Sequence, residues 1–460
     1  MRSRAFILTS LVILTAVILV VGVAVAGAGQ SSPLPDISAP DLLSTMAQTD
    51  GVTAVSGEVS WQNDLFGDLG AASSMAQLPA QSPLTSSGSG RIWVSDAGAK
   101  VESQGSGGDQ VVVLNKAERT AWVYDYAQDT AEKVVVTGEA PAETASPAPS
   151  TAFMTPEAIT LYLLQVARFA TVEVAGQAKV AGQDAYLLRM TPVATDTALG
   201  YVQAAIDGKT MVPLQLTVYA KGGTAPVLRF GFDSITYDSI DPAMFAFTPP
   251  EGATVTTKTV DGDALKAKAD EMHRAQSAKG EPTKAQKEAA QQAVQGALLT
   301  REQVAKLVPY QLAFAREDTA RPFQWGYVLS PAGPLTGSGA PLMQTLGAVT
   351  GMDLTAVTKG SDAPRSGAAT AGPSSVLLYG QGFGTIVLAQ TTTTPDLEKQ
   401  LQQLQQTSQI LGATTVDGVK ALKIGTPLGG VIVWQKGDTT LVAGGMVPMS
   451  DLETFASSVR

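Results

Sequence analysis

The sequence predicts an α+β protein that is mainly antiparallel β, organised in two globular parts. Short segments with apolar residues at alternate positions, separated by turn residues, recur through the first half of the chain, as is typical of antiparallel strands. Few helical segments interrupt them. A stretch rich in Ala, Lys, Gln and Glu over 261–299 then reads as a charged helical linker. We therefore expect one globular domain over 36–257 and a smaller α+β domain over 300–460.

Composition excludes several classes of function. The chain has 460 residues, of which 44% are hydrophobic and 16% charged, with a net charge of -10. Nucleic acid is a poor partner, because phosphate binding needs clustered Lys and Arg. There is no cysteine, and the single histidine, His273, lies in a charged segment typical of an exposed helix.

No motif for catalysis or for a cofactor stands out. The sequence has no phosphate-binding glycine loop, no zinc-protease motif and no nucleophile elbow. Asp125, Asp129 and Glu132 could surround a cation, but a solvated turn after Tyr126 explains them better. We predict no catalytic residue, no metal and no cofactor, and hence a protein that is not an enzyme.

The N-terminus directs the chain out of the cytoplasm. Arg2 and Arg4 precede an uncharged run, and Phe6 to Ala26 supplies the ~20 apolar residues that span a bilayer. Basic residues before such a run place the N-terminus inside and export the remainder of the chain. Small residues at Ala24 and Ala26 also suit cleavage. Residues 1–30 are thus a transmembrane anchor, which leaves a single-pass membrane protein, or a signal peptide of a secreted or periplasmic protein.

The elements of the first half are expected in a fixed order. A helix starts after Ser38, with Pro40 in its first turn, and stops at Gly51. A second helix is expected from Thr155 to about Phe169. The predicted strands are Val52–Trp61, Gly90–Val94, Lys100–Ser103, Gln110–Asn115, Thr120–Tyr126, Glu132–Val136, Val172–Ala175, Lys179–Val180, Ala185–Thr191, Gly200–Asp207, Pro213–Ala220 and Val227–Tyr237.

The second half alternates between helices and strands. Helices are expected to begin at Thr300 and at Thr394, and a last one runs from Met449 to Val459. The predicted strands are Val376–Tyr379, Gly384–Gln390, Thr414–Val416, Val419–Ile424, Gly430–Gln435 and Thr439–Gly444.

Large apolar side chains occupy alternate positions of the strands in the first half. A large sheet with few helices must close, pair with another sheet or curve round something apolar. The pattern fits an ordinary packed core, and it also fits a cavity for an apolar ligand. The residues that would line such a cavity are Trp61, Ile92, Trp122, Tyr124, Leu188, Met190, Leu214, Leu216, Phe230 and Phe232.

A succession of motifs over 36–257 resembles the LolA/RseB-like family of lipoprotein carriers and lipoprotein-sensing regulators. The segment LNKAERTAWVYDYAQDTAEKV is similar to the family's aromatic-Tyr-Asp hairpin, and FAFTPPEGATV is similar to its closing segment. Between them, VAGQDAYLLRMTP and AAIDGKTMVPLQLTVY resemble two further family strands. GSGRIWVSDAGAKVES resembles an earlier strand pair, but has Lys100-Val101-Glu102 where the family carries an arginine before the glutamate.

The resemblance implies an incomplete, strongly curved antiparallel barrel with helices as a lid over its mouth. It implies an extracytoplasmic carrier whose apolar cavity holds acyl chains of lipids or lipoproteins without catalysis. The alternative is a membrane-anchored regulatory module that acts on a membrane partner such as an anti-sigma factor. The C-terminal block more weakly resembles a small α+β domain of unassigned function in exported bacterial proteins.

Overall fold

The structure is a computed structural model. It describes residues 34–49, 52–65, 87–105, 108–138, 168–263, 299–316, 321–329, 374–395, 397–399, 401–402 and 412–460. The expected anchor or signal at 1–30, the helix expected from Thr155 and nearly all of the expected linker lie outside these ranges. Within them, no helix has the length and apolar character needed to cross a bilayer.

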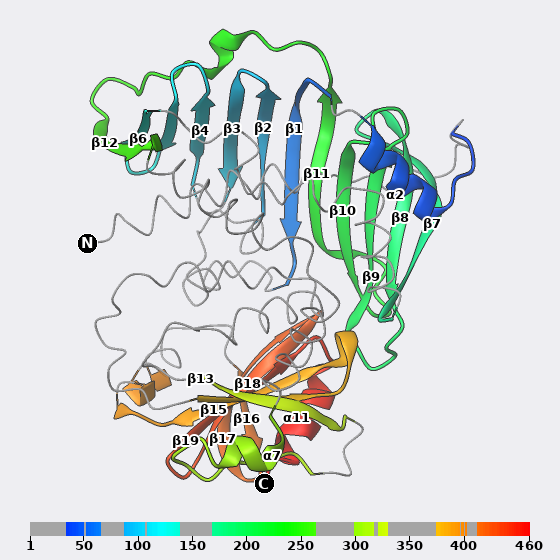
Figure 1. The fold of residues 1–460 in the computed structure, drawn as a ribbon, viewed down its shortest axis with the longest axis vertical. Helices are drawn as coiled ribbons and strands as arrows, with labels where there is room; N and C mark the ends of the chain where they lie inside the picture. The colour runs from blue at the N-terminus through cyan, green and yellow to red at the C-terminus, as the bar shows by residue number, and fades with distance from the viewer. Residues whose placement is uncertain are drawn as a thin grey trace, which may run out of the picture. The chain divides into compact units, whose positions relative to one another are not determined.

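The chain divides into two compact units. The first comprises Met1–Thr191, Tyr201–Tyr219 and Gly223–Gly280, and the second comprises Pro192–Gly200, Ala220–Gly222 and Glu281–Arg460. Each unit is built on one sheet (Figure 1).

The first sheet has twelve strands in the order β12-β6-β5-β4-β3-β2-β1-β11-β10-β9-β8-β7, and its two edges are not joined. The strand pairs whose registers are known are antiparallel, except that β12 runs parallel to β6. The strands are β1 (Ala54–Asn63), β2 (Gly88–Ser95), β3 (Gly98–Gly105), β4 (Gln110–Asn115), β5 (Thr120–Asp125), β6 (Thr130–Thr137), β7 (Ala170–Val180), β8 (Gln183–Pro192), β9 (Leu199–Asp207), β10 (Pro213–Ala220), β11 (Pro226–Thr236) and β12 (Thr254–Asp261).

The predicted fold class is confirmed, since the first unit is an open and mainly antiparallel sheet. Two strands of this unit differ from the sequence prediction. The two short strands expected around Gly176 form one strand, β7, and β12 was not predicted. Most side chains of β12 are exposed, so it lacks the apolar alternation by which a strand is recognised in sequence. The expected domain end at 257 falls inside it.

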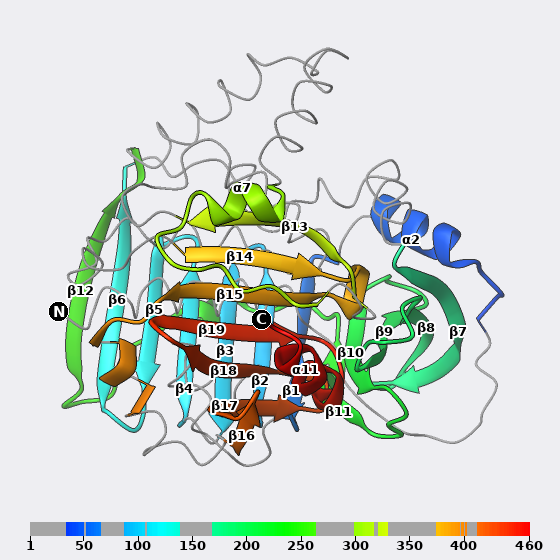
Figure 2. The same cartoon turned by 90° about the horizontal axis from the view of Figure 1, so that it is seen from below.

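The sheet curls at one end, where β7–β10 turn away from the plane of β1–β6 (Figures 1 and 2). Helix α2 (Ala39–Gln48) contacts β7. The Ser38 hydroxyl caps it by accepting a hydrogen bond from the Asp41 N–H, as the sequence predicts. In the other half of the sheet, the 3-10 helix η3 (Pro242–Phe245) contacts β3 and β4.

The second sheet has seven strands in the order β13-β14-β15-β19-β18-β17-β16. Helix α11 (Met449–Ser457) packs on β18 and β19, where Phe455 and Leu452 join Trp434 in a buried core. Helix α7 (Arg301–Ala305) precedes the sheet. The strands are β13 (Phe323–Leu329), β14 (Ser374–Tyr379), β15 (Ile386–Thr392), β16 (Gly412–Val416), β17 (Val419–Thr426), β18 (Gly429–Lys436) and β19 (Thr439–Gly445), and the 3-10 helix η5 (Gly382–Gly384) joins β14 to β15.

Candidate functional site: an apolar strip on one face of the first sheet

The strand registers assign each apolar side chain to one of two faces of the first sheet. Residues that pair directly across neighbouring strands point to the same face, and side chains along a strand alternate. Val112 pairs with Val101, and Val101 pairs with Ile92, so these three share one face. Val113 pairs with Trp122, which puts Trp122 on the other face.

One face carries a continuous cluster of buried apolar side chains, which we call the apolar strip. It crosses β10, β11, β1, β2, β3 and β4, and the same cluster continues to Ala185 on β8 and Ala205 on β9. The strip consists of Val59, Trp61, Ile92, Val101, Val112, Leu214, Phe230 and Phe232.

The opposite face carries two separate clusters, each covered by a short helix. Phe245 of η3 packs with Trp122 and Tyr124 at one end. Leu42 of α2 packs with Tyr186 and Ile206 at the other end. These clusters are closed packing between the sheet and a described element.

The ten residues that the sequence assigns to one cavity surface divide between the two faces. Six lie on the face of the apolar strip: Trp61, Ile92, Leu214, Phe230, Phe232 and Leu216, which pairs with Phe230. Trp122 and Tyr124 lie under η3, Leu188 belongs to the cluster under α2, and Met190 is two residues further along the same strand. The expectation of a single surface is therefore wrong.

The physical reason lies in the runs of consecutive apolar residues. Strand β4 has Val111, Val112 and Val113 in succession, and β8 has Tyr186, Leu187 and Leu188. Both faces of these strands are apolar, so alternation does not say which face a given residue shares with the next strand. A one-residue error in register moves a side chain to the other face. Ligand binding by the six residues on the face of the apolar strip stays a prediction.

Glycines on neighbouring strands let two large aromatic rings of the strip, those of Trp61 and Phe232, lie close to the backbone of the sheet. A β-carbon at Gly88 would come 2.5 Å from Cζ2 of Trp61, and one at Gly57 would come 2.9 Å from Cδ1 of Phe232. These approaches are closer than β-carbons tolerate. A backbone oxygen is at least as close in each case, that of Gln104 at 2.5 Å from the Gly88 position and that of Ser234 at 2.0 Å from the Gly57 position, so the neighbouring backbone requires these glycines together with the rings. The rings and the sheet are thus fitted to each other.

The strip is uncharged on the four strands β1–β4, all of whose residues the structure describes. The charged residues of these strands point to the opposite face, where the Lys100 ammonium lies 2.8 Å from a Glu102 carboxylate oxygen and Arg91 lies 3.8 Å from Glu58. Lys100 also lies over the ring of Trp93 on that face. The lysine and glutamate at the family's arginine motif therefore point away from the strip.

A hydrogen bond between Tyr237 and the buried Asp207 lies next to the strip. The Tyr237 hydroxyl donates a hydrogen bond to Oδ2 of Asp207 at 2.6 Å and accepts one from Thr210. Burial, together with this bond to the carboxylate, raises the pKa of Tyr237 above its ordinary value. Tyr237 therefore stays neutral near pH 7. Its ring packs against the strip, a contact that the sequence analysis did not foresee.

The three carboxylates considered as a cation site have separate structural roles. Asp125 accepts hydrogen bonds from the Ala127 and Gln128 N–H groups, and Asp129 accepts one from the Tyr124 hydroxyl. Glu132 pairs with Lys258 at 2.8 Å. Within the described ranges, no three residues with metal-binding side chains cluster.

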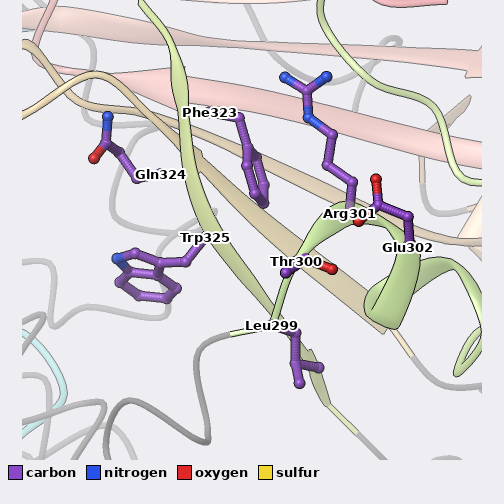
Figure 3. Close-up of a pocket in the computed structure, with 7 residues that line it drawn as sticks. All are labelled: Leu299, Thr300, Arg301, Glu302, Phe323, Gln324 and Trp325. Atoms are coloured by element: carbon purple, nitrogen blue, oxygen red, sulfur yellow. The ribbon is translucent and has the colours of Figure 1, made fainter.

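The second unit has a separate hollow of about 400 Å³ beside its edge strand β13 (Figure 3). Leu299 forms a single bridge to Gly326 through two backbone hydrogen bonds, and Thr300 then caps α7 in a capping box with Gln303. The hollow lies between this segment and the start of β13. Its lining is Leu299, Thr300, Arg301, Glu302, Phe323, Gln324 and Trp325.

Comparison with known proteins gives structural neighbours only. No family model matches the chain, and no curated protein matches it. Among solved structures, it is similar to the MucA/MucB complex of Pseudomonas aeruginosa, with 13% identity and a TM-score of 0.36 over 92% of this chain and 98% of that chain.

Two further neighbours match parts of the chain. A LolA superfamily protein from Nitrosomonas europaea has 8% identity and a TM-score of 0.18 over 46% of this chain and 99% of that chain. A putative outer membrane lipoprotein-sorting protein domain from Vibrio parahaemolyticus has 12% identity and a TM-score of 0.16 over 40% and 72%.

Proposed function

We propose that the chain is an extracytoplasmic binding protein that holds acyl chains of lipids or lipoproteins against the apolar strip, without catalysis. The observation that carries this proposal is the strip itself, a continuous cluster of buried apolar side chains that is uncharged over β1–β4. Each CH₂ group that leaves water stabilises a complex by about 0.8 kcal/mol. Retention of an acyl chain therefore needs apolar area and no reactive side chain.

The N-terminal sequence supports an extracytoplasmic location. The two leading arginines and the apolar run from Phe6 to Ala26 favour export of the remainder, with the run kept as an anchor or removed as a signal. A carbonate wash of membranes separates these outcomes. An anchored chain stays in the pellet, whereas a mature N-terminus at Gly27 or Gly29 would show cleavage.

The proposal is tested by mass spectrometry of the lipids that co-purify with the full chain. We expect acylated species in stoichiometric amounts. A chain that carries no lipid and takes up none from vesicles would contradict the carrier function. Turnover of an ester by such a lipid-free chain would indicate a hydrolase.

The regulatory alternative is supported by the hollow beside β13. An extended segment of a membrane partner, such as an anti-sigma factor, could pair with the edge strand β13 by displacing Leu299, whose backbone pairs with Gly326 at the middle of that edge. This alternative would be favoured if the lipid-free full chain held a membrane protein in a complex that Trp325→Ala disrupts. It would be excluded if Trp325→Ala left every complex of the chain unchanged.

A further inference from the structure

Trp61 is the large aromatic residue at one end of the strip, and its position is tightly determined. It lies on β1 opposite Gly88 of β2, which in turn pairs with Gly105 of β3. A β-carbon at Gly88 would come within 2.9 Å of Cε2, the ring atom bonded to Nε1, and one at Gly105 would lie 3.8 Å from Cζ2. The indole therefore rests across the glycines of two strands.

A second ring fixes the indole from the neighbouring strand on the other side. Phe230 of β11 pairs with Trp61, and their rings stack with centroids 6.4 Å apart and an interplanar angle of 24°. Two glycines and a stacked ring thus hold one orientation of one indole.

The indole N–H nevertheless has no hydrogen-bond partner. Trp61 is only 8% exposed, and its Nε1 is one of two buried side-chain nitrogen or oxygen atoms without a partner in the part of the chain that the structure describes. The other is Nε of Arg229, whose guanidinium reaches Asp233 at 3.6 Å. A buried donor without an acceptor costs about 1–3 kcal/mol, so such groups call for an explanation.

We propose that Nε1 of Trp61 donates a hydrogen bond to the carbonyl oxygen of an ester-linked or amide-linked acyl chain lying on the strip. This inference rests on the proposed function and narrows the ligand to an acyl chain in ester or amide linkage. Indole is a donor only, so it needs an acceptor. On β1–β4 the strip offers no cation, and a free carboxylate buried there would be an unpaired charge. A neutral carbonyl supplies the acceptor without that penalty.

The test compares two probes on the full chain: methyl laurate, which has an ester carbonyl, and tetradecane, which has a chain of similar length and no acceptor. Affinities are measured by displacement of N-phenyl-1-naphthylamine. In Trp61→Phe we expect methyl laurate to bind about three- to tenfold more weakly, as the loss of one hydrogen bond predicts, with tetradecane changed much less. Trp122→Phe is the matched control, because Trp122 is equally buried on the opposite face and should leave both affinities unchanged.

A second variant separates the donor from the shape of the ring. Replacing Trp61 with benzothienylalanine keeps the bicyclic ring and removes the N–H, and it should reproduce the selective loss of methyl laurate. An equal loss of affinity for both probes, or no loss of affinity, would overturn the role of the N–H while leaving the carrier function in place. Failure of the unmodified chain to bind either probe would overturn both proposals.

Discussion

The two faces of the first sheet differ in the elements that pack on them and in the charges that they carry. The face under α2 and η3 has Leu42 and Phe245 inserted from outside the sheet, together with the ion pairs of Lys100 and Arg91. The apolar strip has no charge on β1–β4 and has a buried donor without an acceptor. The packing on the first face stabilises the fold, whereas the second face is the one that we propose binds an uncharged ligand.

The largest expected effect concerns the covered face. Phe245 is 1% exposed and packs on Trp122 and Tyr124. Phe245→Ala should lower the free energy of unfolding by about 3–5 kcal/mol, because it leaves a cavity under η3. Denaturant titration measures this loss, and lipid content per folded chain should not change. A folded variant that loses its lipid would show that the two faces are not independent.

A smaller effect is expected at the cap of α2. The Ser38 hydroxyl accepts a hydrogen bond from the Asp41 N–H at 3.3 Å and donates one to the Asp41 carboxylate at 2.5 Å. Ser38→Ala should lower the free energy of unfolding by about 1 kcal/mol. Because α2 lies on the covered face, retention of lipid should stay as in the unmodified chain. If Ser38→Ala lost its lipid while its free energy of unfolding changed little, α2 would belong to the ligand site.

The smallest effect depends on pH. The folded-state pKa of Tyr237 is raised above the ordinary value near 10, so its contribution to stability is complete below about pH 10 and is lost as the pH rises further. The difference in melting temperature between the unmodified chain and Tyr237→Phe should be constant from pH 7 to 9 and shrink from pH 10 to 11. A difference that grows above pH 10 would contradict the hydrogen bond to Asp207.

Much of the fold was predictable because local signals agree with it. Strands β4 and β10 have the predicted bounds, and Ser38 caps α2 as its position predicts. β12 escaped prediction because a polar edge strand has no apolar period, and its parallel pairing with β6 depends on a distant part of the chain. Local propensity carries no information about such a partner.

For a related reason, the sequence predicts which residues of one strand share a face, but not which residues of different strands do so. Phe230 and Phe232 share a face because they lie two residues apart in one strand. Whether Trp122 joins them depends on the registers of the five strand pairs from β11 to β5, which the residues of a single strand do not determine. The unpartnered N–H of Trp61 has no signal in sequence, because it results from the groups that surround the indole in space.

Phe230→Glu tests whether the apolar strip holds an acyl chain. Phe230 is 8% exposed on the strip, where a carboxylate would be a charge without a partner. Tyr126→Glu is the matched control, since Tyr126 is 54% exposed. Both the melting temperature and the co-purified lipid of each variant are measured. If the strip holds an acyl chain, Phe230→Glu loses its lipid and melts near the unmodified chain, whereas Tyr126→Glu keeps its lipid and its melting temperature. Unfolding of Phe230→Glu would mean that the strip is an ordinary packed core, and a folded variant that retains its lipid would mean that the ligand lies elsewhere.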